Sequence, residues 1–533
     1  MSSRFKIKNG VLIGVDLVSG DITIPINVTE IAPNVFEGCE KLTSVTIPDG
    51  VTKIGASAFS DCSNITRISI PDSVVAIGEA AFAGCEKLKS IVLPSRLRRI
   101  ESELFSGCKS LTAVNVPDNV ECIEELAFAY TSLKRISISI NVKRIVLDSF
   151  CSAFFGSTLE HIDIIDDPSE NAPYKHYAGY YRSHDGVLYS GDDEDESLVF
   201  IPPAKSGDFK IPSTVTHIRK NSFTSSKIRT VYIPASVRII EREAFNNCKQ
   251  LENIFVDPMN QFFSDYSGVL YSSKNERTLV RCPEGKTSVV LSEHTRTIDK
   301  CAFYSCKKIR ELTIPNKAVT IKDFAFFQCS SLKKIHIPSA VNFMGYGSFN
   351  DTPWLNNLAK QNGLVIVNNI LLAVDDARYG TIRVPDGVIK IAPGAFSSSN
   401  FREVYLPETV TVIGESAFAF SKLEKIVLKE GLHTIGSRAF EECDLLKEIT
   451  LPSTIRNIKD AFEDSYLSQI NIDSGKSKYY ASKGGLLYTR DGKRLEVCPP
   501  ACREIEIAEG TQRIHSKALR DCNSIKRLTL PCS

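Results

Sequence analysis

Cysteine and histidine are the residue types in this chain that could hold a metal ion or act as nucleophiles. The 533 residues include 16 cysteines and 8 histidines. Cys498 and Cys502 are close enough in sequence to share a zinc ion, but only Pro-Pro-Ala separates them. No second cysteine pair and no His-Glu-x-x-His motif accompanies them. We therefore expect no metal site and no cofactor.

Sequence motifs for catalysis are also missing. The chain contains no Gly-x-x-x-x-Gly-Lys-Ser/Thr phosphate loop and no Gly-x-Ser-x-Gly nucleophile elbow. Asp-Gly and Asp-Ser pairs recur after prolines, and these pairs are turn formers first and calcium ligands only second. We therefore predict that the chain is not an enzyme and has no catalytic residues.

Most of the cysteines occupy one position of an internal repeat. A position that Cys shares with Ser, Thr and Ala in other repeats requires a small side chain, and buried thiols behave as small hydrophobes. We therefore expect reduced structural cysteines, although neighbouring repeats would be close enough for some disulfides. The cysteines that lie three residues after the recurrent Phe, or its Leu519 counterpart, are Cys39, Cys62, Cys85, Cys108, Cys248, Cys306, Cys329, Cys443 and Cys522.

Aromatic residues at outward positions of predicted strands are the main candidates for binding. Four residues fall in equivalent slots, directly before the last apolar residue of a strand. Exposed aromatics across neighbouring coils would form an amphipathic recognition stripe. The alternative is that aromatics favour strands or pack against hairpins. The predicted partner-binding residues are Tyr232, Phe255, His336 and Tyr405.

Two further segments have unusual composition. Tyr174–His184 is the densest aromatic stretch; it could bind glycan or protein, but its likeness to Phe262–Tyr266 favours a packed approach to a hairpin. The acidic run Asp192–Glu196 is predicted to be the solvated tip of that hairpin. Contact with a basic partner or a cation is its alternative role.

A repeat of 22 or 23 residues must position all of these residues. Ala58–Cys62 returns as Ala81–Cys85, with Phe at the second position and Cys at the fifth. A fixed period of this length marks a solenoid, in which each repeat stacks on its neighbours to bury its apolar face.

One repeat can be read as two extended segments and a corner. Leu42–Pro48 alternates between apolar and polar residues, which predicts a short strand. Val51–Gly55 supplies a second extended segment. Ala56–Cys62 is predicted to form one helical turn, with Phe59 filling the core.

The last apolar residues of the first strands predict a ladder of 20 strands in five runs. Between the runs lie islands that are predicted to form β-hairpins bulging from the stack. The islands contain Asp185–Tyr189, Ser267–Tyr271 and Gly484–Tyr488, with divergent copies at Gly363–Ile366 and Gly10–Ile13. The predicted ladder positions are 24, 47, 70, 93, 116, 138, 164, 211, 233, 256, 291, 314, 337, 384, 406, 428, 451, 472, 507 and 530.

The runs and islands divide the solenoid into five predicted blocks of one continuous body. The first block carries an N-terminal hairpin, and each later block begins with a hairpin island. The blocks are residues 1–165, 166–257, 258–350, 351–473 and 474–533.

Composition and charge exclude several partner classes. The chain is 43% apolar and 24% charged, which is typical of a soluble folded protein. Its net charge of +1, from 64 basic and 63 acidic residues, gives no basis for nucleic-acid binding. Apolar runs fall far short of the roughly 20 residues that span a bilayer. Met1–Gly10 lacks the apolar core of a secretory signal, so the sequence predicts a cytoplasmic chain without membrane insertion.

The repeat resembles a known family. The phrase Ile-Pro-x-x-Val-x-x-Ile-Gly-x-x-Ala-Phe-x-x-Cys, present at Ile47–Cys62 and Ile70–Cys85, resembles the BspA-like leucine-rich repeats, as does the hairpin segment Tyr266–Tyr271. The resemblance covers essentially the whole chain. It implies a β-rich α/β solenoid, a right-handed leucine-rich-repeat horseshoe of about 20 coils. It also implies a surface antigen that acts in adhesion or protein binding, at the surface of bacteria or parasitic protists, without catalytic residues.

We predict from these observations a noncatalytic scaffold that binds protein, with glycan as a further candidate ligand, through its strand wall and hairpin islands. The location is cytoplasmic by sequence and the cell surface by resemblance. The alternative function is a structural solenoid. Because the chain stops at Leu530–Ser533, just after a strand, an uncapped last coil could drive self-association.

Overall fold

The computed structural model describes residues 5–16, 18–148, 152–165, 181–191, 195–272, 275–458, 460–472, 476–478 and 480–531. The chain divides into two compact units, which are described separately below. Unit 1 comprises Met1–Lys274 with Pro283–Lys286. Unit 2 comprises Asn275–Cys282 with Thr287–Ser533.

Each unit is a stack of short coils, so the predicted solenoid of leucine-rich repeats is confirmed. In one coil, strand β5 (Leu42–Thr46) is followed by a turn and by the two-residue strand β6 (Lys53–Ile54). Leu42, Val45 and Ile54 are fully or almost fully buried. The apolar residues of each coil therefore face the interior of the stack, where the neighbouring coils cover them.

We call the face formed by the first strand of each coil the first-strand wall. Neighbouring strands of this wall pair in parallel, as β5 does with β7. In unit 1 the wall comprises β3 (Gly20–Thr23), β5, β7 (Arg67–Ser69), β9 (Ser90–Val92), β11 (Ala113–Asn115), β13 (Arg135–Ser139), β15 (His161–Ile165), β19 (Ser206–Lys210), β21 (Lys227–Ile233) and β23 (Asn253–Val256). In unit 2 it comprises β28 (Glu311–Thr313), β30 (Lys334–His336), β34 (Tyr379–Arg383), β36 (Asn400–Tyr405), β38 (Lys425–Val427), β40 (Glu448–Leu451), β41 (Gln469–Ile472), β45 (Glu504–Glu506) and β47 (Arg527–Thr529).

The predicted strand positions are therefore confirmed with one difference. Every predicted position lies in or directly after a strand except Leu291, where residues 287–292 form no strand. The wall is also not one ladder. Its strands belong to several separate parallel sheets, such as β3-β5-β7, β19-β21-β23 and β34-β36-β38.

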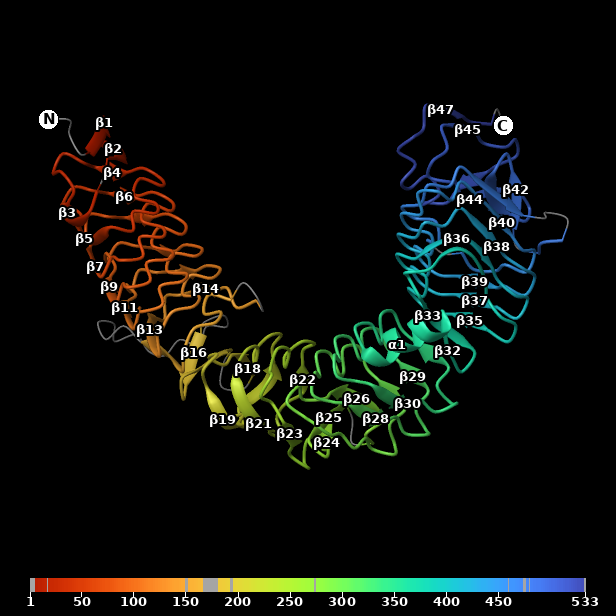
Figure 1. The fold of residues 1–533 in the computed structure, drawn as a ribbon, viewed down its shortest axis with the longest axis horizontal. Helices are drawn as coiled ribbons and strands as arrows, with labels where there is room; N and C mark the ends of the chain where they lie inside the picture. Colours follow the sequence, from red (N-terminus) through yellow and green to blue (C-terminus); the bar gives the residue numbers. More distant parts are fainter. Residues whose placement is uncertain are drawn as a thin grey trace. The chain divides into compact units, whose positions relative to one another are not determined.

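The second extended segments form another set of parallel ladders. In unit 1, Figure 1 shows β3 to β11 along one side of the coils, with β4, β6 and β14 on another side. These strands are β4 (Glu30–Ile31), β6, β8 (Ala76–Ile77), β10 (Arg99–Ile100), β12 (Cys122–Ile123), β14 (Arg144–Ile145), β20 (Val215–Ile218) and β22 (Ile239–Ile240). In unit 2 they are β27 (Thr297–Ile298), β29 (Thr320–Ile321), β31 (Phe343–Met344), β35 (Lys390–Ile391), β37 (Val412–Ile413), β39 (Thr434–Ile435) and β46 (Arg513–Ile514).

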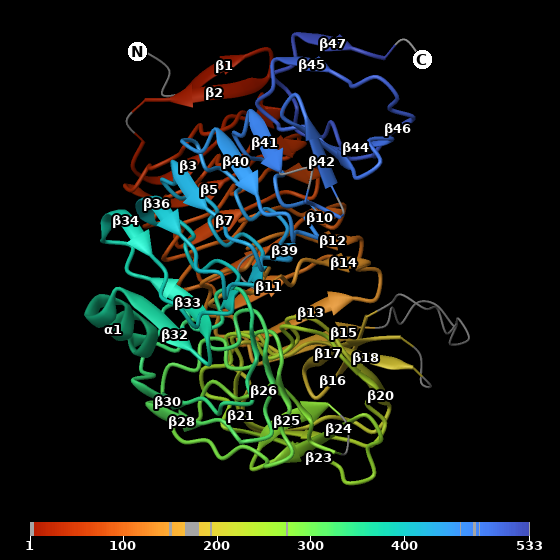
Figure 2. The same ribbon diagram turned by 90° about the vertical axis from the view of Figure 1, so that its right-hand side faces the viewer.

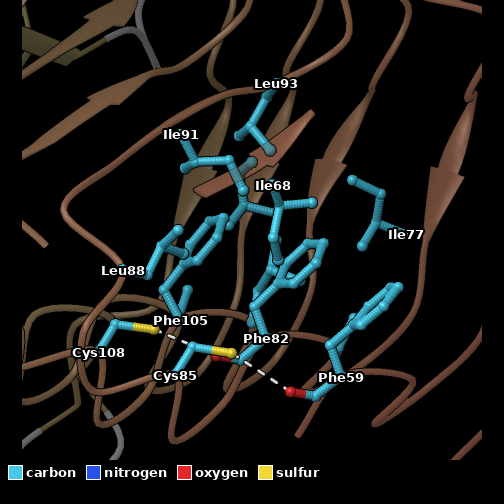
Figure 3. Close-up of a cluster of buried hydrophobic side chains, with 14 of the residues drawn as sticks. Phe59, Ile68, Ile77, Phe82, Cys85, Leu88, Ile91, Leu93, Phe105 and Cys108 are labelled. Atoms are coloured by element: carbon cyan, nitrogen blue, oxygen red, sulfur yellow. Dashed lines mark hydrogen bonds between the residues drawn. The ribbon is translucent and has the colours of Figure 1, made fainter. Parts of the chain in front are cut away.

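A column of stacked phenylalanines fills the core at the coil corners. Phe59, Phe82 and Phe105 are fully buried and lie nearly parallel, with ring centroids 5.7 and 5.8 Å apart (Figure 3). Stacked aromatic pairs contribute about 0.5–1.5 kcal/mol each beyond their buried area. The column therefore links each coil to the next.

The corners are not the helical turns that the sequence predicted. Ser57 and Asp61 have φ values of 52° and 57°, in the left-handed region, which a right-handed helix excludes. Alternate amides donate to the next coil instead of along a helix, as Phe36 N does to Ala58 O at 2.8 Å. Coil stacking has therefore overridden the local helical tendency.

The islands form hairpins, as predicted, but they do not bulge from the stack. In three islands an extra strand precedes the predicted pair, and the last strand then joins a second ladder, as β18 pairs in parallel with β20. The hairpin strands are β1 (Phe5–Lys8), β2 (Val11–Val15), β16 (Tyr181–His184), β17 (Val187–Ser190), β18 (Glu196–Phe200), β24 (Phe263–Tyr266), β25 (Val269–Ser272), β26 (Thr278–Arg281), β32 (Leu364–Val367), β33 (Ile370–Val374), β42 (Tyr480–Lys483), β43 (Leu486–Thr489) and β44 (Arg494–Val497).

One helix, α1 (Pro353–Asn362), is absent from the predicted elements. The hydroxyl of Thr352 caps its first turn by accepting from Leu355 N at 3.3 Å, and Gly363 ends the helix with a φ of 79°. The helix lies beside β32 and β33 (Figures 1 and 2). Among the described residues, no helix has the length and apolar character needed to cross a membrane.

A candidate binding surface on the first-strand wall

Two of the four predicted binding residues lie together on the wall of unit 1. Tyr232 on β21 and Phe255 on β23 are partners in the same ladder, and their ring centroids are 5.6 Å apart. Each side chain is 37% exposed. Lys210 occupies the same register position on β19, with its Nζ 5.8 Å from the centre of the Tyr232 ring. A cation and two aromatic rings therefore form a row across three paired strands.

The row adjoins a hollow in the surface. The hollow has a volume of about 750 Å³. It is lined by Tyr232 and Lys210 together with charged residues of the preceding island. Lys205 Nζ and Asp185 Oδ2 lie 2.9 Å apart at its edge. The surface thus combines aromatic area with groups that can form directional polar contacts.

Further exposed apolar residues follow the row in sequence, and the strand pattern did not single them out. Met259, Phe262 and Tyr266 are all exposed, in the segment that runs from β23 into β24. Val256 N donates to Asp265 Oδ1 at 2.8 Å, which fastens β24 beside β23. Phe262 and Tyr266 belong to a stretch that the sequence led us to expect as packed, but the structure leaves both side chains exposed.

The other two predicted residues lie in unit 2, on different strands. His336 is exposed on β30. Tyr405 on β36 is only half-exposed, because Arg383 lies 4.0 Å from its ring centre, and its hydroxyl donates to Glu403 Oε2 at 3.0 Å. β30 and β36 belong to separate sheets. The structure therefore brings Tyr232 and Phe255 together and leaves His336 and Tyr405 apart from each other.

The repeat cysteines contribute to the core. Cys85 Sγ donates to Phe59 O at 3.2 Å and Cys108 Sγ to Phe82 O at 3.1 Å (Figure 3). Burial raises the pKa of Cys108 to about 12 and that of Cys85 well above the ordinary value. Because the thiolate is the reactive form, these thiols are unsuited to nucleophilic chemistry. The cysteines in the described part of the chain are reduced thiols.

Cys498 and Cys502, which are close enough in sequence to share a zinc ion, lie in the core of the last coils. A hydrogen bond to Cys502, together with Cys522 and burial, raises the pKa of Cys498. Cys502 Sγ donates to Ser468 O at 3.2 Å. Within the described ranges, no group of three or more His, Cys, Asp and Glu side chains is arranged to hold a metal ion.

The two segments of unusual composition are described only in part. Tyr174 to Tyr180 and Asp192 to Glu194 lie outside the described residues. Tyr181 is half-buried, and its hydroxyl accepts from Ile145 N at 3.4 Å. Glu196 accepts from the hydroxyl of Thr214 at 2.6 Å. The described ends of both segments thus contact neighbouring coils.

Comparisons with known proteins agree with the repeat. The model of the BspA type leucine rich repeat region, in six copies, matches residues 29–155, 204–274, 281–372 and 375–482. We find no match among curated proteins.

Solved structures also match the chain. A leucine rich cell surface protein from Faecalibacterium prausnitzii is 31% identical over 63% of this chain and 77% of its own, with a TM-score of 0.42. The pneumococcal vaccine antigen PcpA is 18% identical over 80% of this chain and 96% of its own, with a TM-score of 0.41. Since the family model covers most of the sequence, the chain belongs to the BspA type leucine-rich repeat family.

Proposed function

We propose that this chain is a noncatalytic scaffold that binds other proteins through its first-strand wall, with Tyr232 and Phe255 as anchors. The observation that carries the proposal is the row of Lys210, Tyr232 and Phe255 across three paired strands beside a hollow of about 750 Å³. Aromatic residues that are held rigidly on strands offer large contact area with little entropy to lose, and such residues dominate binding energy at protein interfaces.

The repeat architecture supports this role. A solenoid presents a long row of equivalent positions, and changes at outward positions leave the buried face intact. The buried thiols of Cys85 and Cys108 have raised pKa values, which fits a structural part for the repeat cysteines. Binding would then depend on surface complementarity.

The test is a binding screen with matched variants. The immobilised chain is probed with purified extracellular proteins and glycans by biolayer interferometry, and each binder is measured again with the double variant Tyr232→Ser/Phe255→Ser. We expect the affinity of a protein binder to fall at least about tenfold, because aromatic anchors carry on the order of 2 kcal/mol each.

Val92→Ser is the matched control. Val92 occupies the same repeat slot on β9 and is 69% exposed, so its change should leave affinity within about twofold. The proposal would be contradicted if protein binders kept their affinity for the double variant, or if only glycans bound to the chain.

A further inference from the structure

The first-strand wall of unit 2 is interrupted at Leu291. The side chain of Leu291 is buried, as at other repeat positions of its kind. Yet residues 287–292 form no strand, and among the described residues no backbone hydrogen bond joins residues 287–291 to β28. At equivalent positions Ile211 N donates to Tyr232 O and Ile314 N to His336 O, each at 3.0 Å.

This interruption leaves one edge of β28 open. β28 pairs in parallel with β30, with Leu312 opposite Ile335. The backbone groups of Leu312 and Ile314 face β30, so those of Glu311 and Thr313 face the opposite way, toward residues 287–291. Wall strands β7 and β9 also lie in different sheets, but both of those segments are strands. In the part of the chain that the structure describes, β28 pairs with a strand on one side only, β30.

A hollow of about 1310 Å³ lies along the open edge. Leu291 and Leu312, both buried, and the half-buried Ile335 are among the apolar residues that line it. Val290, which is 63% exposed, and His336 also line it. The hollow therefore offers apolar contacts next to backbone donors and acceptors.

The charged residues around the hollow are mainly basic. Lys307, Lys308, Arg310 and Lys334 line it and are exposed, against two acidic residues, Glu293 and Glu311. None of the four basic side chains takes part in a salt bridge within the described part of the chain. Their charges are thus available to an acidic ligand.

We propose that this hollow binds an extended acidic segment of another protein, which adds as a strand to the open edge of β28. An added strand pairs through its main chain, while alternate side chains point in opposite directions. One set of side chains would contact Leu312 and Val290, and the other would meet Arg310 and Lys334. This inference rests on the proposed role of the first-strand wall in protein binding. It adds a second binding site on that wall and states the chemistry of the partner that the site would bind.

An acidic peptide fits the hollow better than a sulfated glycan does. Both ligands would satisfy the basic side chains. Only a polypeptide carries N–H and C=O groups at the spacing of a strand, which can pair with the carbonyl and amide groups of Glu311 and Thr313. A polypeptide with alternating residues also has apolar side chains for Val290 and Leu291.

The experiment measures three labelled probes on the full chain by fluorescence anisotropy. The first is a peptide of alternating Glu and Val. The second is the same peptide with alternate backbone nitrogens methylated, which keeps the charge and removes the N–H donors. The third is a heparin oligosaccharide. We expect the first peptide to bind and the methylated peptide to bind at least about tenfold more weakly, since each lost backbone hydrogen bond weakens binding severalfold.

Charge-reversal variants locate the site. Arg310→Glu/Lys334→Glu should weaken binding of the Glu-Val peptide at least about tenfold, because two attractive contacts become repulsive. The matched control is Lys134→Glu/Arg67→Glu, which changes the same repeat positions in unit 1 and reverses the same charge. The control should bind the peptide like the unmodified chain. Circular dichroism melting curves verify that both variants are folded.

The outcomes separate this inference from the proposed function. Equal binding of the plain and methylated peptides, or stronger binding of heparin, would show a site for polyanions only and overturn the inference. Unchanged affinity in Arg310→Glu/Lys334→Glu would also overturn it. The variant Tyr232→Ser/Phe255→Ser should bind the peptide normally, so peptide binding without any protein binder at the aromatic pair would reject the proposed function alone.

Discussion

The wall around Tyr232 and Phe255 and the wall around β28 differ in their hydrogen bonding but not in their core. In the first region three strands, β19, β21 and β23, form a continuous ladder. In the second, residues 287–292, which hold the first-strand position of the coil before β28, form no strand. Beneath both regions phenylalanines pack at the same spacing, with centroids 4.7 Å apart for Phe223 and Phe245 and also for Phe303 and Phe326.

The difference shows that the core and the wall are separable layers of one repeat. The core side chains hold a coil on its neighbour even where the strand ladder is interrupted. Outward positions and strand edges can then vary from coil to coil without loss of the stack. The region of Tyr232 and Phe255 presents aromatic rings on three paired strands. The region of β28 presents an open strand edge with basic side chains nearby.

Removing the core phenylalanine should have the largest effect, and an equal one in both regions. Phe223 and Phe303 are both fully buried, so we expect Phe223→Ala and Phe303→Ala each to lower the free energy of unfolding by about 3–5 kcal/mol. Urea denaturation measures the change. Val290→Ala, at an exposed position of the open region, is the control and should stay within about 0.5 kcal/mol. A much smaller loss for Phe303→Ala would mean that the open wall also loosens the core.

Thiol reactivity also tests whether the core beneath the open region is as tight as the core elsewhere, and it does so without a mutation. Burial raises the pKa of Cys108 to about 12, from an ordinary value of 9.0, so at pH 9 its thiolate fraction falls by a factor of several hundred. Labelling with iodoacetamide should therefore stay slow from pH 7 to pH 10 in the folded chain. Cys306 is fully buried beneath the open region, so the surrounding side chains should keep the reagent from its sulfur as well. Rapid labelling of Cys306 alone would show that solvent reaches the core there.

Amide hydrogen exchange should separate the two walls. Tyr232 N–H lies inside the ladder of β19 and β21, whereas Thr313 N–H lies on the open edge of β28. We expect Thr313 to exchange at least about 100-fold faster than Tyr232, because local opening costs little free energy where no partner strand exists. Nuclear magnetic resonance or mass spectrometry at peptide resolution provides the rates. Similar protection at both positions would mean that residues 287–291 pair with β28 in solution.

Ion pairs should contribute least in either region. Arg229 and Glu252 pair at 3.2 Å on the closed wall, and Lys322 and Asp299 pair at 2.9 Å between coils of the open region. All four side chains are partly exposed, so Arg229→Ala and Lys322→Ala should each cost less than about 1 kcal/mol. Added salt should remove most of that difference in thermal melts. If Lys322→Ala lost more than about 2 kcal/mol of unfolding free energy, the ion pair would be compensating for the missing strand ladder in the open region.

Much of the architecture could be predicted from the sequence because the same pattern of apolar and small residues recurs in each coil. Apolar alternation before the prolines predicted the first strands. The island that opens at Asp185–Tyr189 predicted a hairpin, which the structure confirms as β17 paired with β18. The helix α1 was missed although its signals are present in Thr352, Pro353 and Gly363. The helix lies in a segment that does not follow the repeat period, so the repeat does not predict it.

The candidate sites were predictable only where exposure follows from strand alternation. Tyr232 and Phe255 were placed outward and on neighbouring strands, as the structure has them. The exposure of Met259 and Phe262 follows no repeat pattern, so it could not be predicted. At Leu291 the run Val289–Leu291 is apolar throughout. A similar run, Ile91–Leu93, overlaps strand β9 in unit 1, so the run does not signal that the strand at Leu291 is missing.

The sequence by itself determined the period, the buried positions and the small residue at each corner, because every coil must satisfy the same packing constraint on both of its faces. Only the tertiary structure decided which neighbouring strands pair, where the ladder stops and which outward side chains meet. Those features depend on how successive coils contact each other, and no residue pattern within a single repeat encodes such contacts.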